Sequence, residues 1–228
     1  MWKTVLEVAL LGGIVCLDRI FLQALISRPL VAGSITGLFL HDPLTGMIAG
    51  AYIELLWIDR LPIGSYLPPN DSIVAILAAA SAILVGRTIE ATSPVLITLA
   101  ILLFLPAGLL GRRLDGMLAA TNTGLALRAE EAAAEGNTSK ITRYHLTALL
   151  RHFVTTATAL FVLLMVGLFL IERIVPHFPE GIHRALGVLY CFIPVLGIGV
   201  ALNTIKVRGA LPLFSGLFLV VMVMRYLW

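Results

Sequence analysis

The 228-residue sequence contains little charge and almost no cysteine. Charged residues make up 13% of it, hydrophobic residues make up 59%, and there are two cysteines. A soluble domain has about 25% charged residues, so this composition, with a mean hydropathy of +1.00, excludes that class. Two cysteines in apolar segments, Cys16 and Cys191, indicate no disulfide framework, and we expect both to be small buried hydrophobic residues. The composition predicts an integral membrane protein.

The sequence also lacks the motifs of common catalytic sites. It contains no GxxxxGK[ST] phosphate loop, GxSxG elbow, HExxH pair or cluster of cysteine and histidine at ligand spacing. It has no basic run interleaved with aromatic residues, which nucleic-acid binding would require. His145 and His152 lie seven residues apart at the edge of an apolar segment, where we expect a structural role. We therefore predict no catalytic residue, metal, cofactor or nucleic-acid partner.

Long apolar segments dominate the rest of the sequence, and two of them are too short to cross a membrane. A spanning helix needs about 20 residues, so we interpret residues 29–40 and 46–58 as half-helices or re-entrant hairpin arms. We predict an all-α polytopic membrane protein, with about six full transmembrane helices plus these hairpins. The apolar segments cover residues 5–26, 29–40, 46–58, 73–89, 94–110, 146–171, 185–202 and 211–227.

One long polar segment divides the chain. We expect residues 1–228 to form a single membrane domain, with a site-bearing part over 1–111, a connector over 112–146 and C-terminal helices over 147–228. An Ala/Glu-rich helix in the connector is predicted to end near Gly136 and Asn137. The positive-inside rule places the connector in the cytoplasm, because the following cations gather in or beside it: Arg112, Arg113, Arg128, Lys140, Arg143 and Arg151.

The most informative interruption lies between Asp59 and Asn70. Pro62, Gly64, Pro68 and Pro69 fall there, and such residues do not continue a helix. Asn70 or Asp71 then suits the N-cap of a helix that runs to Ile89. Backbone broken at membrane depth is tolerated where protein or a water-lined cavity satisfies its polar groups, and transporter sites are commonly built this way.

Polar side chains in apolar sequence mark the candidate site. A charge at the centre of a bilayer costs about 2.5–3.5 kcal/mol or more, so these residues need partners or a ligand. Glu54 and Trp57 share a helix face, and a carboxylate beside an aromatic ring suits the hydroxyls and the apolar face of a neutral sugar. The predicted substrate-binding residues are Gln23, Glu54, Trp57, Asn70 and Asp71, with Asp18 as a further candidate.

Structural alternatives remain open for most of these residues. Glu54 has Arg28 or Arg60 as a candidate ion-pair partner, and Asp18 has its neighbour Arg19. Asp71 has the alternative role of a helix cap, and Trp57 that of a packing residue. Two glycine pairs, Gly33 with Gly37 and Gly46 with Gly50, are interpreted as sites of close helix packing without chemistry.

Two stretches of the chain carry a resemblance to a known family. They are LDRIFLQALISRPLVAGSITGLFLHD, residues 17–42, and GMIAGAYIELLWIDRLPIGSYLPPND, residues 46–71. The combination of RPLVAG, a glycine-rich element ending in EL, then PIG and PP, resembles the membrane IIC component of the mannose/fructose/sorbose family of the phosphoenolpyruvate-dependent sugar phosphotransferase system.

This resemblance implies a sugar permease subunit in the bacterial cytoplasmic membrane. It implies a mobile core that contains hairpins, a fixed scaffold and an elevator-like movement of sugar. It also implies an oligomeric complex, with a IID membrane partner, surrounding lipid, and soluble IIA and IIB proteins whose histidines relay phosphate to the sugar. Two alternatives stay open: a membrane scaffold for IID and IIB that moves no sugar, and an unrelated ion-coupled transporter.

Overall fold

A computed structural model describes residues 1–60, 66–89, 94–205 and 209–227, and its regular structure there is helical. The elements are α1 (Trp2–Leu17), α2 (Pro29–Phe39), α3 (Pro43–Leu56), α4 (Asp71–Thr88), α5 (Pro94–Ala134), α6 (Thr138–Ile174), the short 3₁₀ helix η1 (Val175–His177), α7 (Glu180–Ile205) and α8 (Ala210–Leu227). Among the described residues, four helices, α4 to α7, are long and apolar enough to cross a membrane. The predicted all-α membrane fold is confirmed, while the number of spans stays a prediction.

Helix α4 is the centre of the fold. Its residues 72–86 are all buried, and α1, α2, α3, α5 and α6 pack against it. A helix that is apolar on every side is expected in the interior. Many of its side chains are alanines with no exposed surface, which lets several helices approach its axis. The start of α4 is therefore held in place by most of the molecule.

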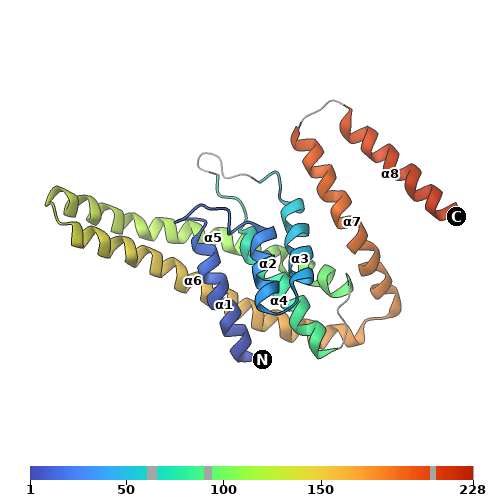
Figure 1. Cartoon of the computed structure of the whole chain (residues 1–228), viewed down its shortest axis with the longest axis horizontal. Helices are drawn as coiled ribbons and strands as arrows, with labels where there is room; N and C mark the ends of the chain where they lie inside the picture. Colours follow the sequence, from blue (N-terminus) through green and yellow to red (C-terminus); the bar gives the residue numbers. More distant parts are fainter. Residues whose placement is uncertain (61–65, 90–93, 206–208, 228) are drawn as a thin grey trace.

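Helices α2 and α3 form a short hairpin that lies against α4 (Figure 1). They have 11 and 14 residues, or about 17 and 21 Å at 1.5 Å per residue, which is less than a bilayer core of about 30 Å. The glycine pairs of the two helices face each other: a Cβ on Gly33 would lie 2.6 Å from the carbonyl oxygen of Gly46. The predictions of short arms and close glycine packing are confirmed.

The predicted break between α3 and α4 is present. Helix α3 ends at Leu56, and α4 begins at Asp71. The Asn70 side chain accepts a hydrogen bond from the backbone N–H of Ile73 at 3.2 Å, so Asn70 is the N-cap, as one of the two alternatives predicted. Pro62 and Gly64, which contributed to that prediction, lie outside the described residues.

The first apolar segment is shorter as a helix than we predicted. Helix α1 stops at Leu17, and residues 18–28 form turns instead of continuing the helix to residue 26. Gln23 and Leu25 have positive φ angles of 53° and 65°. Asp18 ends the helix because its carboxylate accepts hydrogen bonds from residues six and nine positions later, which a continuous helix does not allow.

Helices α5 and α6 form a long antiparallel hairpin that extends beyond the other helices (Figure 1). The first of these helices ends at Ala134, near Gly136 and Asn137 as predicted. The chain turns at Gly136, with a positive φ of 69°, and the side chain of Asn137 caps α6. The predicted connector is not a separate element. Its polar residues belong to the same two helices as the neighbouring apolar segments, so only the hydropathy changes there.

The C-terminal helices lie on the other side of the molecule from this hairpin (Figure 1). Helix α7 packs on α3 and α5, and α8, within the described residues, packs on α7. Cys16 is buried, as predicted, but Cys191 is exposed on α7, so that prediction was wrong for one of the two cysteines. Cys191 is apolar enough for a lipid-facing position, which sequence hydropathy does not distinguish from a buried one.

Candidate functional site

Four helix ends meet at one level of the molecule. There α1 and α3 end and α2 and α4 begin, and the turn segment 18–28 joins α1 to α2. The Ser72 hydroxyl at the start of α4 donates a hydrogen bond to the carbonyl oxygen of Ser27, and Arg19 reaches Asp71. Helix ends leave backbone N–H and C=O groups without helical partners, so this region is polar although the surrounding helices are apolar. We call the turn segment, the end of α3 and the starts of α2 and α4 the polar level.

Asp18 organises the turn segment and does not pair with Arg19. Its carboxylate accepts hydrogen bonds from the backbone N–H of Ala24 at 2.7 Å and from the N–H and hydroxyl of Ser27 at 2.9 and 3.0 Å. Only 2% of the Asp18 surface is exposed. The considered Asp18–Arg19 pair was therefore wrong, because backbone donors satisfy Asp18 and Arg19 binds elsewhere.

Arg19 instead pairs with Asp71 across the site. The guanidinium lies 2.6 Å from Oδ1 of Asp71, and both side chains are about one-fifth exposed. A second guanidinium nitrogen donates to the carbonyl oxygen of Pro69 at 3.3 Å. Asp71 is thus the first residue of α4 and an ion-pair partner, and part of its surface remains open to a ligand.

Glu54 connects the end of α3 to the beginning of α2. Its Oε2 accepts the backbone N–H of Leu30 at 3.0 Å, and its Oε1 lies 3.4 Å from the guanidinium of Arg28. A carboxylate at a helix N-terminus is favoured by the helix dipole. Of the two alternative partners, the structure has Arg28, while Arg60 pairs with Asp59. The Glu54 side chain is still 24% exposed.

Asn70 is the most deeply buried of the predicted site residues, with no exposed surface. Its backbone N–H donates to the carbonyl oxygen of Gly108 in α5 at 2.9 Å, and its Nδ2 donates to Oδ2 of Asp115 at 3.0 Å. In this conformation a ligand can contact the residues around Asn70 but not Asn70 itself. The predicted direct contact with sugar stays a prediction that requires a movement.

Trp57 and Gln23 lie at the edges of the site. The Trp57 ring is half-buried and packs on α5, where a Cβ on Gly108 would lie 2.7 Å from its Cη2 atom. Gln23 is exposed in the turn segment, and its N–H donates to the backbone oxygen of Asp18. The packing alternative for Trp57 therefore has a visible basis, and its role beside a sugar stays a prediction.

Sequence reasoning missed Asp115 and the face of α5 that carries it. Asp115 directly follows Arg112, Arg113 and Leu114 at the end of an apolar segment, so it looked like part of a solvated connector. Gly108, Gly111 and Asp115 are spaced three and four residues apart, which places them on one face of a helix. That spacing was the available signal.

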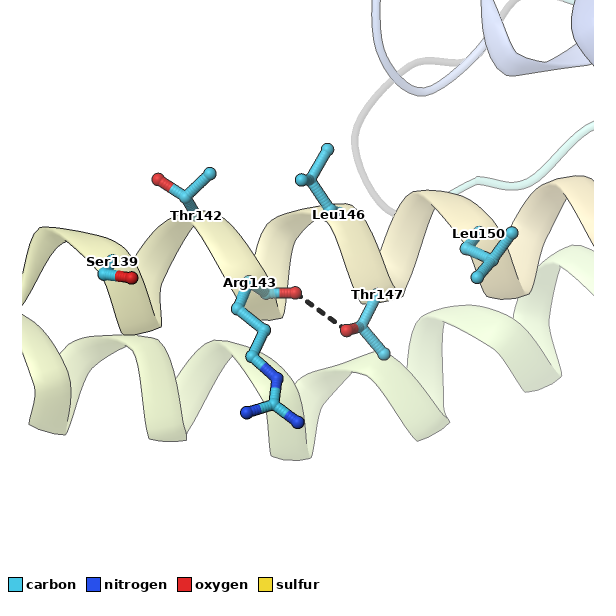
Figure 2. A pocket seen from close by; sticks show the side chains of 6 residues that line it. All are labelled: Ser139, Thr142, Arg143, Leu146, Thr147 and Leu150. Atoms are coloured by element: carbon cyan, nitrogen blue, oxygen red, sulfur yellow. Dashed lines mark hydrogen bonds between the residues drawn. The ribbon is translucent and has the colours of Figure 1, made fainter.

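Two hollows in the described structure lie away from this polar level. One, of about 470 Å³, follows the exposed side of α6. Figure 2 shows its six lining side chains, all from α6, with the Thr147 hydroxyl donating to the backbone oxygen of Arg143 at 2.7 Å. The other, of about 330 Å³, lies between α5 and α6 and is lined by apolar residues and glycine. Neither offers the convergent polar groups that fix a sugar.

The polar level offers both hydrogen-bond donors and acceptors with nearly balanced charge. The ion pairs Arg19–Asp71 and Arg28–Glu54 are each partly exposed, and backbone donors satisfy Asp18. Guanidinium groups donate and carboxylates accept, so this arrangement suits an uncharged hydroxylated ligand better than an ion. Among the described residues, no three His, Cys, Asp or Glu side chains are grouped as metal ligands.

The chain is similar to known proteins along most of its length. The family model described as "PTS system sorbose-specific iic component" matches residues 2–227. The sorbose-specific EIIC component of Lacticaseibacillus casei is 29% identical over 192 residues, covering 82% of this chain and 65% of that protein. The mannose-specific EIIC component of Escherichia coli K12 is 24% identical over 215 residues, covering 92% and 78%.

A third relative and a solved structure agree with these matches. The fructose permease IIC component of Bacillus subtilis is 23% identical over 187 residues, covering 82% of this chain and 66% of that protein. A solved chain titled "Structure of membrane protein" matches with a TM-score of 0.68 and 21% identity, covering 99% of this chain and 94% of that one. The fold is therefore shared. The chain belongs to the family of sorbose-specific IIC components, within the mannose class of the sugar phosphotransferase system.

Proposed function

We propose that this chain is the sugar-translocating IIC subunit of its system and that it binds a neutral hexose-type sugar at the polar level where α1 to α4 meet. The observation that carries this proposal is the break between α3 and α4, with two partly exposed ion pairs beside it. Ionisable groups inside a membrane protein pair with one another and commonly mark the path of a substrate. Family membership supplies the class of ligand.

Each predicted residue receives a role in this proposal. Glu54 and Asp71 accept hydrogen bonds from sugar hydroxyls, since both carboxylates retain exposed surface. Trp57 covers the apolar face of the ring, and Gln23 approaches from the turn segment. Asn70 supports the site from beneath and reaches the sugar after a local movement. Asp18 holds the turn segment in shape.

We further propose that the site moves while the scaffold stays in place. The short α2–α3 hairpin and the start of α4 belong to the part over residues 1–111, which carries the sugar inward. Phosphorylation is assigned to a soluble IIB protein that receives phosphate from IIA, so this chain supplies no phosphoryl group. A IID subunit completes the membrane complex. This division of labour follows from the family resemblance.

The first test is the substitution Glu54→Gln. Glutamine keeps the shape and an acceptor for the Leu30 N–H, but it loses the charge that strengthens hydrogen bonds to hydroxyls. Each hydrogen bond to a charged group contributes about 1 kcal/mol more than a neutral one, so we expect the Kd for sugar to rise about fivefold for each hydroxyl that Glu54 binds. The measurement is binding of labelled mannose, fructose and sorbose to the purified complex with IID, together with phosphoenolpyruvate-dependent uptake.

The matched control is Glu172→Gln. Glu172 is a half-buried glutamate on α6, near Thr88 at the opposite end of α4 from the site, and this variant is expected to bind sugar normally. Equal binding by the Glu54→Gln and wild-type proteins would contradict the proposed site. Uptake that follows an ion gradient and ignores phosphoenolpyruvate would favour the ion-coupled alternative, and tight IIB binding without any sugar binding would favour the scaffold.

A further inference from the structure

We propose that Asp115 is a positioning residue for the sugar site and that it acts through Asn70. This inference rests on the proposed function and deepens it, because it adds a residue from the long α5–α6 hairpin to a site built from α1 to α4. Asp115 does not touch the sugar in this account. It sets the position of the segment that does.

The first support is a cradle on α5 that fits Asn70. The carbonyl oxygen of Gly108 accepts the Asn70 backbone N–H at 2.9 Å, and Oδ2 of Asp115 accepts its Nδ2 at 3.0 Å. Between them, Gly111 leaves room: a Cβ there would lie 2.6 Å from Cβ of Asn70. One face of α5 thus binds both the backbone and the side chain of Asn70 through two acceptors, and the glycine between the acceptors allows the close approach.

The second support is the effect of this cradle on the amide. Only the nitrogen of an asparagine amide donates, and only its oxygen accepts. With Nδ2 directed at Asp115, Oδ1 faces the Ile73 N–H, which it accepts at 3.2 Å. The carboxylate therefore fixes the orientation in which Asn70 caps α4. Without it, the amide is free to turn and the first turn of α4 loses its cap.

The third support is the path from Asn70 to the site. The next residue, Asp71, holds Arg19, and Arg19 also donates to the backbone oxygen of Pro69. The charge of Asp115 interacts with Arg19 and Asp71. A displacement of Asn70 therefore moves the Asp71 carboxylate and its guanidinium partner, which are the groups proposed to meet the sugar.

Another residue near Asp115 is a buried histidine on α6. His152 is 3% exposed, and its Nε2 has no hydrogen-bond partner among the described residues. Its ring interacts electrostatically with Asp115. Asp115 is thus half-buried beside Arg19 of the turn segment, Asn70 at the start of α4 and His152 of α6. Through Asp115 and Gly108, α5 holds the start of α4.

The test compares Asp115→Leu with Asp115→Asn in phosphoenolpyruvate-dependent uptake. Leucine removes the acceptor, whereas asparagine keeps one oxygen for Nδ2 of Asn70. We expect Asp115→Leu to raise the KM for sugar at least fivefold with a maximal rate within twofold, per amount of protein in the membrane, and Asp115→Asn to stay within twofold of wild type. Glu130→Leu, at an exposed glutamate on the same helix, is the control and is expected to match wild type.

A second variant tests the same idea without changing Asp115. Gly111→Ala places a methyl group against Asn70 and is expected to raise the KM in the same way. Gly116→Ala, on the same helix with nothing within 4 Å of its Cβ, is expected to have no effect. In the background of Asn70→Ala, Asp115→Leu is expected to add less than a twofold further rise in KM.

An unchanged KM for both Asp115→Leu and Gly111→Ala would overturn the inference, and so would an equal loss in Asp115→Asn and Asp115→Leu, because charge and not the bond to Asn70 would then be responsible. If Glu54→Gln and Asn70→Ala raise the KM while those two variants do not, only this inference fails. If Glu54→Gln and Asn70→Ala also leave it unchanged, the proposed function fails first.

Discussion

At the scale of single residues, the carboxylates near the site divide into two kinds. Asp18 is satisfied by backbone and hydroxyl donors of the turn segment, and it is almost fully buried. Glu54 and Asp71 are held by arginines and keep part of their surface open. A buried, fully bonded carboxylate fixes structure, while a partly open one has capacity left for a ligand. The two kinds should respond differently to substitution.

We predict that Asp18→Ala lowers the free energy of unfolding more than the substitution of an exposed aspartate does. Three hydrogen bonds to a carboxylate are lost, and their donors lie in a segment with two strained residues, Gln23 and Leu25. We expect a loss of about 2–3 kcal/mol, measured as a lower thermal unfolding temperature in detergent. Asp59→Ala, at an exposed residue paired with exposed Arg60, is the control. A loss as small as that of the control would contradict this role.

At the scale of elements, the close packing of α2 on α3 depends on glycines, which have no side chain, at the contact between the two helices. Gly33 and Gly37 of α2 face Gly46 and Gly50 of α3, and at each position an added Cβ would meet backbone atoms. Backbone, unlike the end of a flexible side chain, yields only if the helices move apart. The spacing of α2 from α3, and with it the position of Glu54 relative to the start of α2, is therefore set by these four glycines.

We predict that Gly33→Ala separates the two helices. Its Cβ would lie 2.6 Å from the carbonyl oxygen of Gly46, and overpacking of this kind costs about 1–3 kcal/mol. Gly124→Ala is the matched control, since nothing lies within 4 Å of a Cβ at that helical position, and it should be neutral or slightly stabilising. Thermal unfolding of the two variants checks this. The same unfolding temperature for both would show that the hairpin tolerates a wider spacing.

The sequence predicts several of the helix boundaries. It does not predict those boundaries and contacts that depend on residues far apart in the chain. Pro68 and Pro69 followed by Asn70 predicted the break and the cap, because proline and a capping side chain act locally. The end of α1 at Leu17 was missed because it depends on hydrogen bonds to residues 24 and 27. The Arg19–Asp71 pair and the bond of Asn70 to Asp115 join residues about 50 positions apart, and hydropathy carries no information on such partners.

At the scale of the whole molecule, this is a multi-pass protein of the bacterial inner membrane with an extended arm. Residues 116–134 of α5, at 1.5 Å per residue, are about 28 Å long and run beside α6 beyond the rest of the fold (Figure 1). Arg128 on this part of α5, with Lys140 and Arg143 on the facing part of α6, are three of the six cations that orient the chain by the positive-inside rule. Its tip at Gly136 is exposed and has nothing within 4 Å of an added Cβ.

We predict that the tip of this arm lies in the cytoplasm. A protease recognition sequence inserted after Glu135, at an exposed turn where insertions are tolerated, should be cleaved in inside-out vesicles and protected in right-side-out vesicles. Uptake before cleavage serves as the control for folding. Cleavage in right-side-out vesicles alone would contradict this topology.

The central claim is that sugar occupies the break between α3 and α4. Leu67→Cys places a thiol on an exposed residue of that break, in a Cys191→Ser background where the remaining Cys16 is fully buried. The measurement is the rate at which a maleimide alkylates this thiol in the purified complex, with and without sugar, beside Leu127→Cys on the arm. The account predicts that sugar slows alkylation at position 67 at least threefold and leaves position 127 unchanged. Bound sugar with an unaltered rate at position 67 would contradict it.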